Sequence, residues 1–236
     1  MAKAKEAMGA WFGRLPKADC VVAETPTGPT AFYFPPATDG TRPGTFFVNT
    51  ADPTRWGRFE IEAMAYHEGI PGHHLQLAIA QELENVPDFR KHAQVTVYAE
   101  GWGLYTERLA DEMGLYGGSL ERFGMLSADS MRAGRLVVDT GIHAKGWTRQ
   151  QAIDYFLANS PMSQGTVEGE VDRYIGMPGQ ALSYMIGRLE INRMREEAAA
   201  AMGDRFDIKG FHDTVLGSGL VPMETLDRMV RDWVAA

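Results

Sequence analysis

A histidine-rich stretch that contains Pro71 and Gly72 constrains the fold of this chain more than any other segment. It covers residues 66–74, reads YHEGIPGHH, and holds three of the six histidines and one acid. A proline removes a backbone donor and clashes with the carbonyl four residues earlier, which here belongs to His67. Glycine at the next position permits backbone angles that are closed to other residues. We therefore expect a helix that ends or kinks just after Glu68 and resumes near the later histidines.

These residue types are those of a hydrolytic zinc site, in which imidazole nitrogens bind the metal and a carboxylate activates water. In the common zinc-peptidase motif HExxH the two histidines lie one helical turn apart, but here Pro71 takes the second place. On an unbroken helix His67 and His74 would lie about 10 Å apart along the axis. A break at Pro71 can bring either His73 or His74 beside His67, and His73 is favoured if the break absorbs two residues. The alternative is a buried helix that ends at Gly69, followed by solvated histidines.

A second segment supplies a candidate carboxylate. Apolar residues at helical spacing between positions 95 and 109 predict a largely buried helix that contains Glu100. A buried carboxylate without a partner is costly, so a residue in such a place is usually paired or bound to a metal. Glu107 lies on the same face seven residues later, where it can orient a metal-bound histidine. For both glutamates the alternative is a salt bridge to Arg108 or Arg135.

Three segments that occur in order along the chain resemble the signature of the bacterial family known as domain of unknown function 885. They read HExxPGH from His67, EGWxLYxE from Glu100 and RYxxxPGQALxY from Arg173. That family is grouped with the gluzincin-type zinc metallopeptidases, so the resemblance implies a zincin-like helical catalytic domain. It implies that His67, His73 and Glu100 hold a zinc ion (Zn2+). It also implies that Glu68 is the general base.

The resemblance runs from about residue 11 to the C-terminus and covers only the C-terminal half of the family's typical proteins. The N-terminal helical half, which would form the other wall of the cleft, has no counterpart in this sequence. We therefore weigh three functions. The first is a zinc-dependent peptidase. The second is a metal-dependent hydrolase of non-peptide amides or esters, and the third is a non-catalytic half or subunit that lacks its N-terminal partner.

The third segment also offers candidates for catalysis and substrate binding. Hydrolysis of a peptide needs a donor for the oxyanion that forms during attack on the carbonyl. Tyr184 is the best candidate, because a phenol can donate without carrying charge. Arg173, Tyr174 and His143 are the other candidates, and Asp139 can fix the ring of His143 from one turn away. For the two tyrosines the alternative is a core position with a satisfied hydroxyl.

Residues 20–50 are rich in proline and glycine and predict two short strands around a turn, at 31–34 and 45–48. In gluzincin-type peptidases an exposed edge strand above the metal pairs with the extended substrate. The segment from Thr45 to Asn49, which includes Phe47, is placed in sequence for that role and would supply main-chain hydrogen bonds. The alternative is an ordinary hairpin that covers the core.

Helical periodicity dominates from residue 58 onward, and 236 residues with 44% hydrophobic content suffice for one well-packed domain. We expect a mainly α domain over residues 1–236, with the hairpin region at 20–50 and the helical region at 58–236. A further helix at 1–14 would dock elsewhere, and His92 and His212 would lie at the surface or at helix ends. The predicted helices are 58–69, 73–85, 92–113, 119–145, 148–158, 166–175, 179–202, 208–216 and 223–234.

The composition limits the possible partners, site types and cellular locations of this chain. A net charge of -8 argues against nucleic acid, since phosphate binding needs a basic face. The single Cys20 excludes an internal disulfide framework and a cysteine-based zinc site. No apolar run reaches membrane-spanning length and the first residues lack the apolar core of a signal peptide, so the chain as written is expected to be cytoplasmic. That expectation fails if Met1 is an internal position of a longer gene product.

The apolar segment from Ala7 to Leu15 has nothing upstream to bury it, and the cleft face would likewise be bare. Soluble monomers rarely leave contiguous apolar patches larger than a few hundred Å². We therefore expect a homo-oligomer, or a partner chain that supplies the absent N-terminal half, with a peptide or small amide as substrate.

Overall fold

Three strands near the N-terminus form a small sheet in the computed structural model, which describes residues 1–52 and 57–236. β1 (Cys20–Thr25), β2 (Ala31–Phe34) and β3 (Gly44–Asn49) lie in the order β1-β3-β2. β1 runs parallel to β3, and β2 runs antiparallel to it. The strands predicted at 31–34 and 45–48 are confirmed as β2 and β3. β1 was not predicted, because an edge strand with exposed valines carries no clear burial pattern.

The expectation that the segment from Thr45 to Asn49 forms an exposed edge strand is wrong. β3 is the central strand, and its main-chain groups pair with β1 on one side and with β2 on the other. Phe47 stacks on Phe32 of β2, with ring centroids 5.0 Å apart. An extended peptide can therefore add only to β1 or β2, and β2 is the edge strand that contacts helix α2 (Ile61–Glu68).

Helices make up most of the remaining chain, which confirms the mainly α class. The predicted boundaries hold within a few residues, and the expected helix 92–113 corresponds to α5, whereas the short helix α4 before it was not predicted. Thr148 and Gln151 form the capping box at the start of α7. Besides α2, the α-helices are α1 (Ala2–Trp11), α3 (His73–Glu82), α4 (Asp88–His92), α5 (Thr96–Glu112), α6 (Ser119–Lys145), α7 (Arg149–Asn159), α8 (Gln164–Gly176), α9 (Ser183–Met202), α10 (Ile208–Leu216) and α11 (Met223–Ala235), and the short 3-10 helices are η2 (Arg58–Glu60), η3 (Gln180–Leu182) and η4 (Gly203–Arg205).

α1 packs on its own chain, so the expectation that it docks elsewhere is wrong. Met8 and Phe12 are 3% and 2% exposed, and the Phe12 ring stacks on His212 of α10 with centroids 4.6 Å apart. The expectation of a surface position for His212 is also wrong, because this side chain is fully buried. Its Nδ1–H donates to the carbonyl of Trp11 at 2.8 Å, and its Nε2 accepts from the Tyr105 hydroxyl at 2.7 Å. In the segment from Ala7 to Leu15, on which the partner prediction partly rested, Met8 and Phe12 are thus buried within the chain, whereas Leu15 is 48% exposed.

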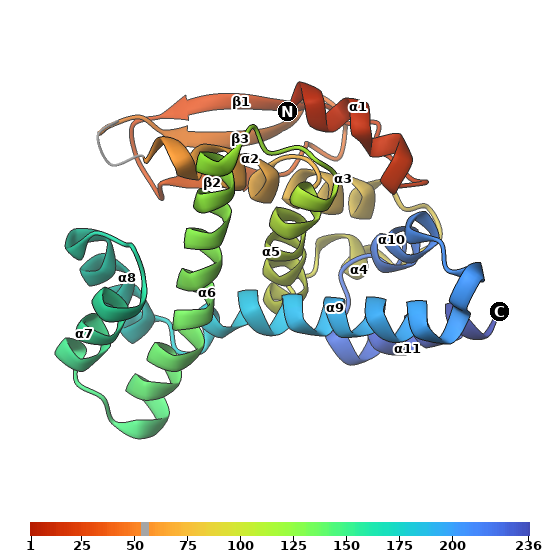
Figure 1. Ribbon diagram of the computed structural model, residues 1–236. Coiled ribbons are helices and arrows are strands. Elements are labelled where there is room, and N and C mark those ends of the chain that lie inside the picture. Colours follow the sequence, from red (N-terminus) through yellow and green to blue (C-terminus); the bar gives the residue numbers. More distant parts are fainter. Residues whose placement is uncertain (53–56) are drawn as a thin grey trace.

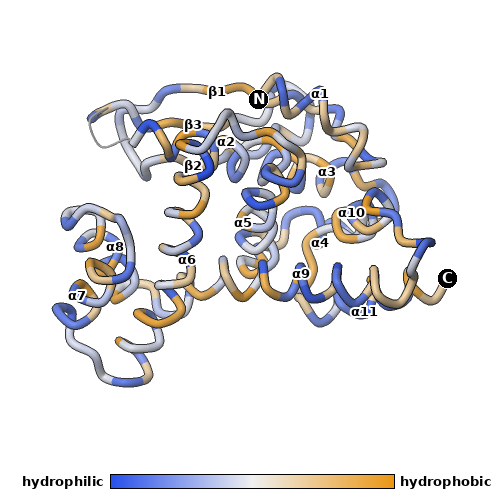
Figure 2. The backbone as a smooth tube through the Cα atoms, viewed as in Figure 1, coloured by the Kyte–Doolittle hydropathy of each residue, from blue (hydrophilic) through white to orange (hydrophobic). Residues whose placement is uncertain are grey.

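Two buried clusters organise the helices. The larger one contains Trp102 and lies among α1, α2, α3, α5 and α9 to α11, whereas the smaller one surrounds Phe156 among α6, α7 and α8. The long helix α6 runs from the sheet to the α7–α8 pair (Figure 1). Hydrophobic and hydrophilic stretches alternate along it (Figure 2), as expected of a helix that packs on one face. Within the described residues, no helix has both the length and the apolarity to span a membrane.

Two glycines allow α5 and α9 to cross at close range. A Cβ on Gly187 would lie 2.0 Å from the carbonyl oxygen of Val97, and one on Gly101 would lie 2.4 Å from the Cα of Gly187. No other residue fits at either position without a shift of backbone. This crossing brings the start of α9, which carries Tyr184, against the middle of α5, which carries Glu100.

We predict that Gly187→Ala lowers the free energy of unfolding by about 1–3 kcal/mol, because the added methyl group forces the two helices apart. Urea unfolding followed by circular dichroism measures this change. The matched control is Gly169→Ala in α8, where a Cβ would meet nothing within 4 Å. Alanine favours a helix interior over glycine, so this control should raise stability by up to about 1 kcal/mol. Equal effects of the two substitutions would contradict the close crossing.

Candidate metal centre

The break predicted at Pro71 separates α2 from α3. The helices are joined by residues 69–72, and a Cβ on Gly72 would lie 1.9 Å from the carbonyl oxygen of His67. Only glycine permits this approach of backbone to backbone. The buried indole of Trp102 on α5 fixes the turn, since its Nε1–H donates to the carbonyls of Pro71 at 3.0 Å and Gly72 at 3.3 Å. The expected interruption of the helix is confirmed.

This turn brings His67 and His73 together. Their rings lie 4.7 Å apart at an interplanar angle of 87°, and Gly103 on α5 leaves room for the His67 ring. The Nε2 atom of each histidine lies 3.4 Å from Oε2 of Glu100, and the three possible ligand atoms all lie within 4.8 Å of one another. Two donors bound to one tetrahedral zinc ion are about 3.3 Å apart. The donor set and its spacing therefore fit a single zinc ion.

His74 is turned away from this cluster. Its Nε2–H donates to the carbonyl of Ala18 at 3.1 Å, and its Nδ1 accepts from the Tyr33 hydroxyl at 2.8 Å. Burial lowers the pKa of His74, in keeping with a neutral ring that holds the sheet onto α3. Of the two alternatives left open by the sequence, the structure brings His73 to His67 and Glu100.

Glu107 contacts the His67 ring at the nitrogen that does not face Glu100. Its Oε1 accepts from Nδ1–H of His67 at 2.8 Å, which directs Nε2 of the ring toward Glu100. Arg132 approaches the same Glu107 oxygen at 3.6 Å, and all three side chains are buried. The alternative salt bridges do not form, because Arg108 and Arg135 pair with other acids. Carboxylates that orient a metal-bound imidazole from behind are a regular feature of zinc sites.

The charges around the cluster favour a cation between the ligands. Burial by itself lowers the pKa of His67, but its contacts with Glu100 and Glu107 outweigh burial and raise that pKa to about 10. Burial by itself raises the pKa of Glu100, but its contacts with His67 and His73 hold that pKa well below its ordinary value. A proton and a metal ion compete for such a site, since both satisfy the same lone pairs.

Glu68 follows His67 at the end of α2 and is 8% exposed. Within the described part of the chain, its carboxylate has no hydrogen bond or ion pair with another side chain or backbone group. An unpaired acid that follows the candidate ligand His67 in the chain is available to accept a proton.

Tyr184 also reaches the cluster. Its ring lies 6.2 Å from the ring of His67, at an angle of 27°. Its hydroxyl oxygen accepts from Nε2–H of Gln180 at 3.3 Å, so its own proton is free to be donated. Burial, and then the negative charge of Glu100, raise the pKa of Tyr184, which keeps the phenol protonated at neutral pH.

The other substrate-binding candidates have different positions. Arg173 donates from Nη1 to Oε1 of Gln180 at 2.6 Å, and Gln180 in turn contacts Tyr184. Tyr174 is fully buried, and its carbonyl accepts from Nε2–H of His143 at 2.9 Å. Among the described residues, neither His143 nor Phe47 has a hydrogen bond, ion pair or ring contact with the three ligands.

The expected support of His143 by Asp139 is replaced by a different contact. The Asp139 carboxylate accepts the backbone N–H of Gly179 at 3.1 Å, at the turn that precedes α9. Asp139 therefore fixes the entry to the helix that carries Tyr184.

The sequence analysis did not identify two contributing residues. Arg132 contacts Glu107, and Gln180 contacts Tyr184. The available signal for Arg132 is its spacing of three residues from Arg135, which places both guanidinium groups on one face of α6. For Gln180 the sequence offers no comparable signal, because its role depends on the turn before α9.

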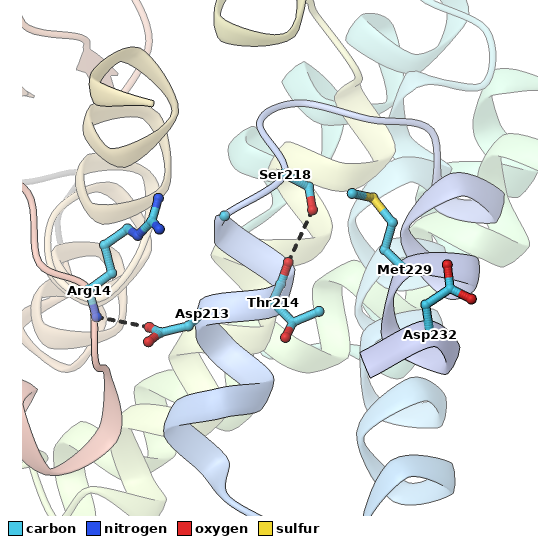
Figure 3. Close-up of a pocket in the computed structure, with 7 residues that line it drawn as sticks. Arg14, Asp213, Thr214, Ser218, Met229 and Asp232 are labelled. Carbon is cyan, nitrogen blue, oxygen red and sulfur yellow. Dashed lines mark hydrogen bonds between the residues drawn. The ribbon is translucent and has the colours of Figure 1, made fainter. Parts of the chain in front are cut away.

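An open pocket of about 360 Å³ shares no lining residue with the cluster. Figure 3 shows residues that line this pocket. Two hydrogen bonds join its lining residues: the Arg14 backbone N–H donates to Oδ1 of Asp213 at 2.9 Å, and the Ser218 hydroxyl donates to the Thr214 carbonyl at 3.2 Å. It is lined by Arg14, Asp213, Thr214, Gly217, Ser218, Met229 and Asp232. We find no convergent catalytic chemistry there.

The fold and the cluster define a mainly helical protein with a candidate two-histidine, one-glutamate metal centre. The chain belongs to the bacterial family of proteins of unknown function described as DUF885, whose sequence model matches residues 1–230. No functionally curated protein matches the chain.

Two solved structures are similar over nearly the whole chain. One is described as "the putative lipoprotein from Colwellia psychrerythraea"; it is 39% identical with a TM-score of 0.96, and the match covers 99% of this chain and 41% of that one. The other is described as a putative lipoprotein of unknown function from Shewanella oneidensis; it is 26% identical with a TM-score of 0.83, and the match covers 98% of this chain and 44% of that one. This chain thus spans less than half the length of either solved relative.

We predict that the wild-type protein, purified from zinc-replete medium, contains close to one zinc ion per chain. His67→Ala and Glu100→Ala should reduce that content to near zero, because each removes a donor from a three-donor site. His74→Gln is the matched control and should retain zinc, since both ring nitrogens of His74 serve the fold. Inductively coupled plasma mass spectrometry provides the measurement. Equal zinc contents in wild type and His67→Ala would remove the metal site.

We predict an opposite pH response in the metal-free and zinc-bound proteins. The pKa of His67 is raised from 6.5 to about 10 in the folded metal-free chain. Its contribution to stability is therefore complete below pH 6.5 and is lost as the pH rises toward 10. Zinc needs the deprotonated ring, so zinc affinity should rise over the same range. Urea unfolding with zinc or with a chelator tests both trends, and His67→Gln should flatten the metal-free curve.

Proposed function

We propose that this protein is a zinc-dependent peptidase of the gluzincin type. The observation that supports this proposal is the convergence of His67, His73 and Glu100, with ligand atoms within 4.8 Å of one another, beside the unpaired carboxylate of Glu68. Two histidines and one carboxylate leave a position open for water or substrate, which distinguishes catalytic zinc sites from closed structural ones.

Each neighbouring side chain has a definite part in this reaction. Zinc bound by the three ligands would supply a Lewis acid that polarises the scissile carbonyl. Glu68 would accept a proton from the attacking water and pass it to the departing amine. Tyr184 would donate its hydroxyl proton to the oxyanion, as its protonated state and its position beside His67 permit. Glu107 would hold His67 in the tautomer that presents Nε2.

Two alternatives remain in view. A metal-dependent hydrolase of non-peptide amides or esters would use the same cluster and differ only in the shape of the substrate site. A peptide library screened beside small amides and esters distinguishes the peptidase from this hydrolase.

A non-catalytic subunit is favoured by a separate observation, namely that the solved relatives are more than twice as long as the segment they share with this chain. For that alternative, activity would appear only when a second chain is added.

The partner and the cellular location of this protein stay predictions. Exposed apolar residues on α6 and α9, namely Leu120, Phe123, Leu126, Ile186 and Leu189, favour a homo-oligomer or a partner chain. Both solved relatives are named lipoproteins, which favours a location outside the cytoplasm as the alternative to the cytoplasmic one.

We predict that Glu68→Gln keeps its zinc and loses about two to four orders of magnitude in turnover of a peptide pool, because the amide cannot accept the proton. Mass spectrometry of the digested pool measures turnover, and metal analysis of the same sample confirms loading. Glu112→Gln serves as the control, since this acid is at the far end of α5 and pairs with Arg195. Full activity in zinc-loaded Glu68→Gln would exclude Glu68 as the base.

A further inference from the structure

Three arginines lie beside the candidate metal centre, and we call them the arginine cluster: Arg132, Arg135 and Arg173. Arg132 and Arg135 project from α6 and are only 6% and 5% exposed. Their Cζ atoms lie 5.8 Å and 4.5 Å from the centroid of the Tyr184 ring. Since that ring lies 6.2 Å from the ring of His67, the arginine cluster adjoins the metal ligands.

Two donors of the arginine cluster are buried without a partner. Arg135 donates from Nε to the Tyr174 hydroxyl at 2.9 Å and from Nη2 to Glu170 at 2.7 Å, but its Nη1 has no acceptor among the described residues. The Nε of Arg132 is likewise buried and without an acceptor in the described part of the chain. A buried donor on a charged group is costly when it is unpaired, so such groups in native proteins usually meet a water or a ligand.

The arginine cluster has more guanidinium groups than it has carboxylate partners. Its three guanidinium groups face two carboxylates, those of Glu107 and Glu170. Of the other acids nearby, Glu68 and Glu100 would be balanced by a divalent metal ion, and the Asp139 carboxylate accepts the backbone N–H of Gly179. The ion pairs of the arginine cluster therefore contain one guanidinium group more than carboxylates.

One member of the arginine cluster is accessible to solvent. The side chain of Arg173 is 30% exposed, and its Nη1 donates to Oε1 of Gln180. Gln180 in turn donates to the Tyr184 hydroxyl, so hydrogen bonds connect the partly exposed Arg173 to Tyr184.

We propose that the arginine cluster binds a carboxylate of the substrate, next to the bond that is cleaved. A guanidinium group pairs with a carboxylate through two parallel hydrogen bonds, which fixes direction as well as position. The carboxylate can be the C-terminus of a short peptide or an aspartate or glutamate side chain. This inference rests on the proposed peptidase function and deepens it, because it selects peptides with a free carboxylate near the scissile bond.

Peptide binding to the zinc-loaded Glu68→Gln protein, measured by isothermal titration calorimetry, tests the inference without turnover. The probes are N-acetyl-Ala-Ala-Phe, its C-terminal amide, and N-acetyl-Ala-Glu-Phe amide. A carboxylate should tighten binding about tenfold to hundredfold relative to the neutral amide. Preference for the first probe identifies a C-terminal carboxylate, and preference for the third identifies an acidic side chain.

Substitutions in the same background locate the site. Arg173→Gln and Arg135→Gln should abolish the preference for a carboxylate, whereas Arg149→Gln, at an exposed ion pair with Asp172, should preserve it. Because Arg135 is buried, thermal unfolding of Arg135→Gln is measured first. The partly exposed Arg173→Gln and the charge-conserving Arg135→Lys keep the test valid if that variant does not fold.

Equal affinity for the three probes, or a preference that survives Arg173→Gln and Arg135→Lys alike, would overturn carboxylate recognition. Failure of all three probes to bind would overturn it as well. Parallel digestion of a peptide pool by the wild-type protein separates this result from failure of the proposed function. Cleavage of amidated and free peptides at equal rates leaves the peptidase in place without a carboxylate site, and absence of any cleavage counts against the peptidase itself.

Discussion

The turn between α2 and α3, fixed by the buried indole of Trp102, is the constraint on which the rest of the site depends. A continuous helix would separate the two histidine ligands along its axis, and a flexible break would leave their relative positions undefined. Trp102 removes that freedom, because its single N–H is shared between two carbonyls of the turn. Net contributions of such hydrogen bonds to stability are only about 0.5–1.5 kcal/mol. Their importance here is geometric, since one residue of α5 sets the turn while Glu100, half a turn earlier, is the third candidate ligand.

Buried charge is the cost of this arrangement, and the surrounding helices compensate for it. Three buried side chains contact one another in the order His67, Glu107 and Arg132. The Glu107 carboxylate thus lies between the His67 ring and the guanidinium group of Arg132 on α6. Removing one of these side chains leaves its neighbour buried and unpaired, which destabilises a protein more than replacing the whole set by apolar side chains. The same helix carries Arg135 beneath Tyr184, so α6 balances charge on both sides of the candidate metal centre.

The two solved relatives contain a similar segment within longer chains. At 39% identity the shared segment keeps its fold almost unchanged, with a TM-score of 0.96, although it makes up 41% of that longer chain. The segment that this chain shares with it contains both buried clusters and the three candidate metal ligands. It also leaves apolar residues of α6 and α9 exposed.

The sequence alone determined the mainly α class, the position of the helix break, and the residues His67, Glu68 and Glu100 as candidates. These follow from local rules, namely helical periodicity, the backbone properties of proline and glycine, and the chemistry of the side chains. It left His73 and His74 as alternatives, because a turn of unknown angles can present either ring. The tertiary structure decided between them, since Tyr33 and Ala18 from distant segments occupy both nitrogens of His74. Strand order was also beyond the sequence, because a parallel partner such as β1 joins β3 across 24 residues without a local signal. The arginine cluster and the burial of His212 likewise depend on contacts between segments far apart in the chain, which no local pattern encodes.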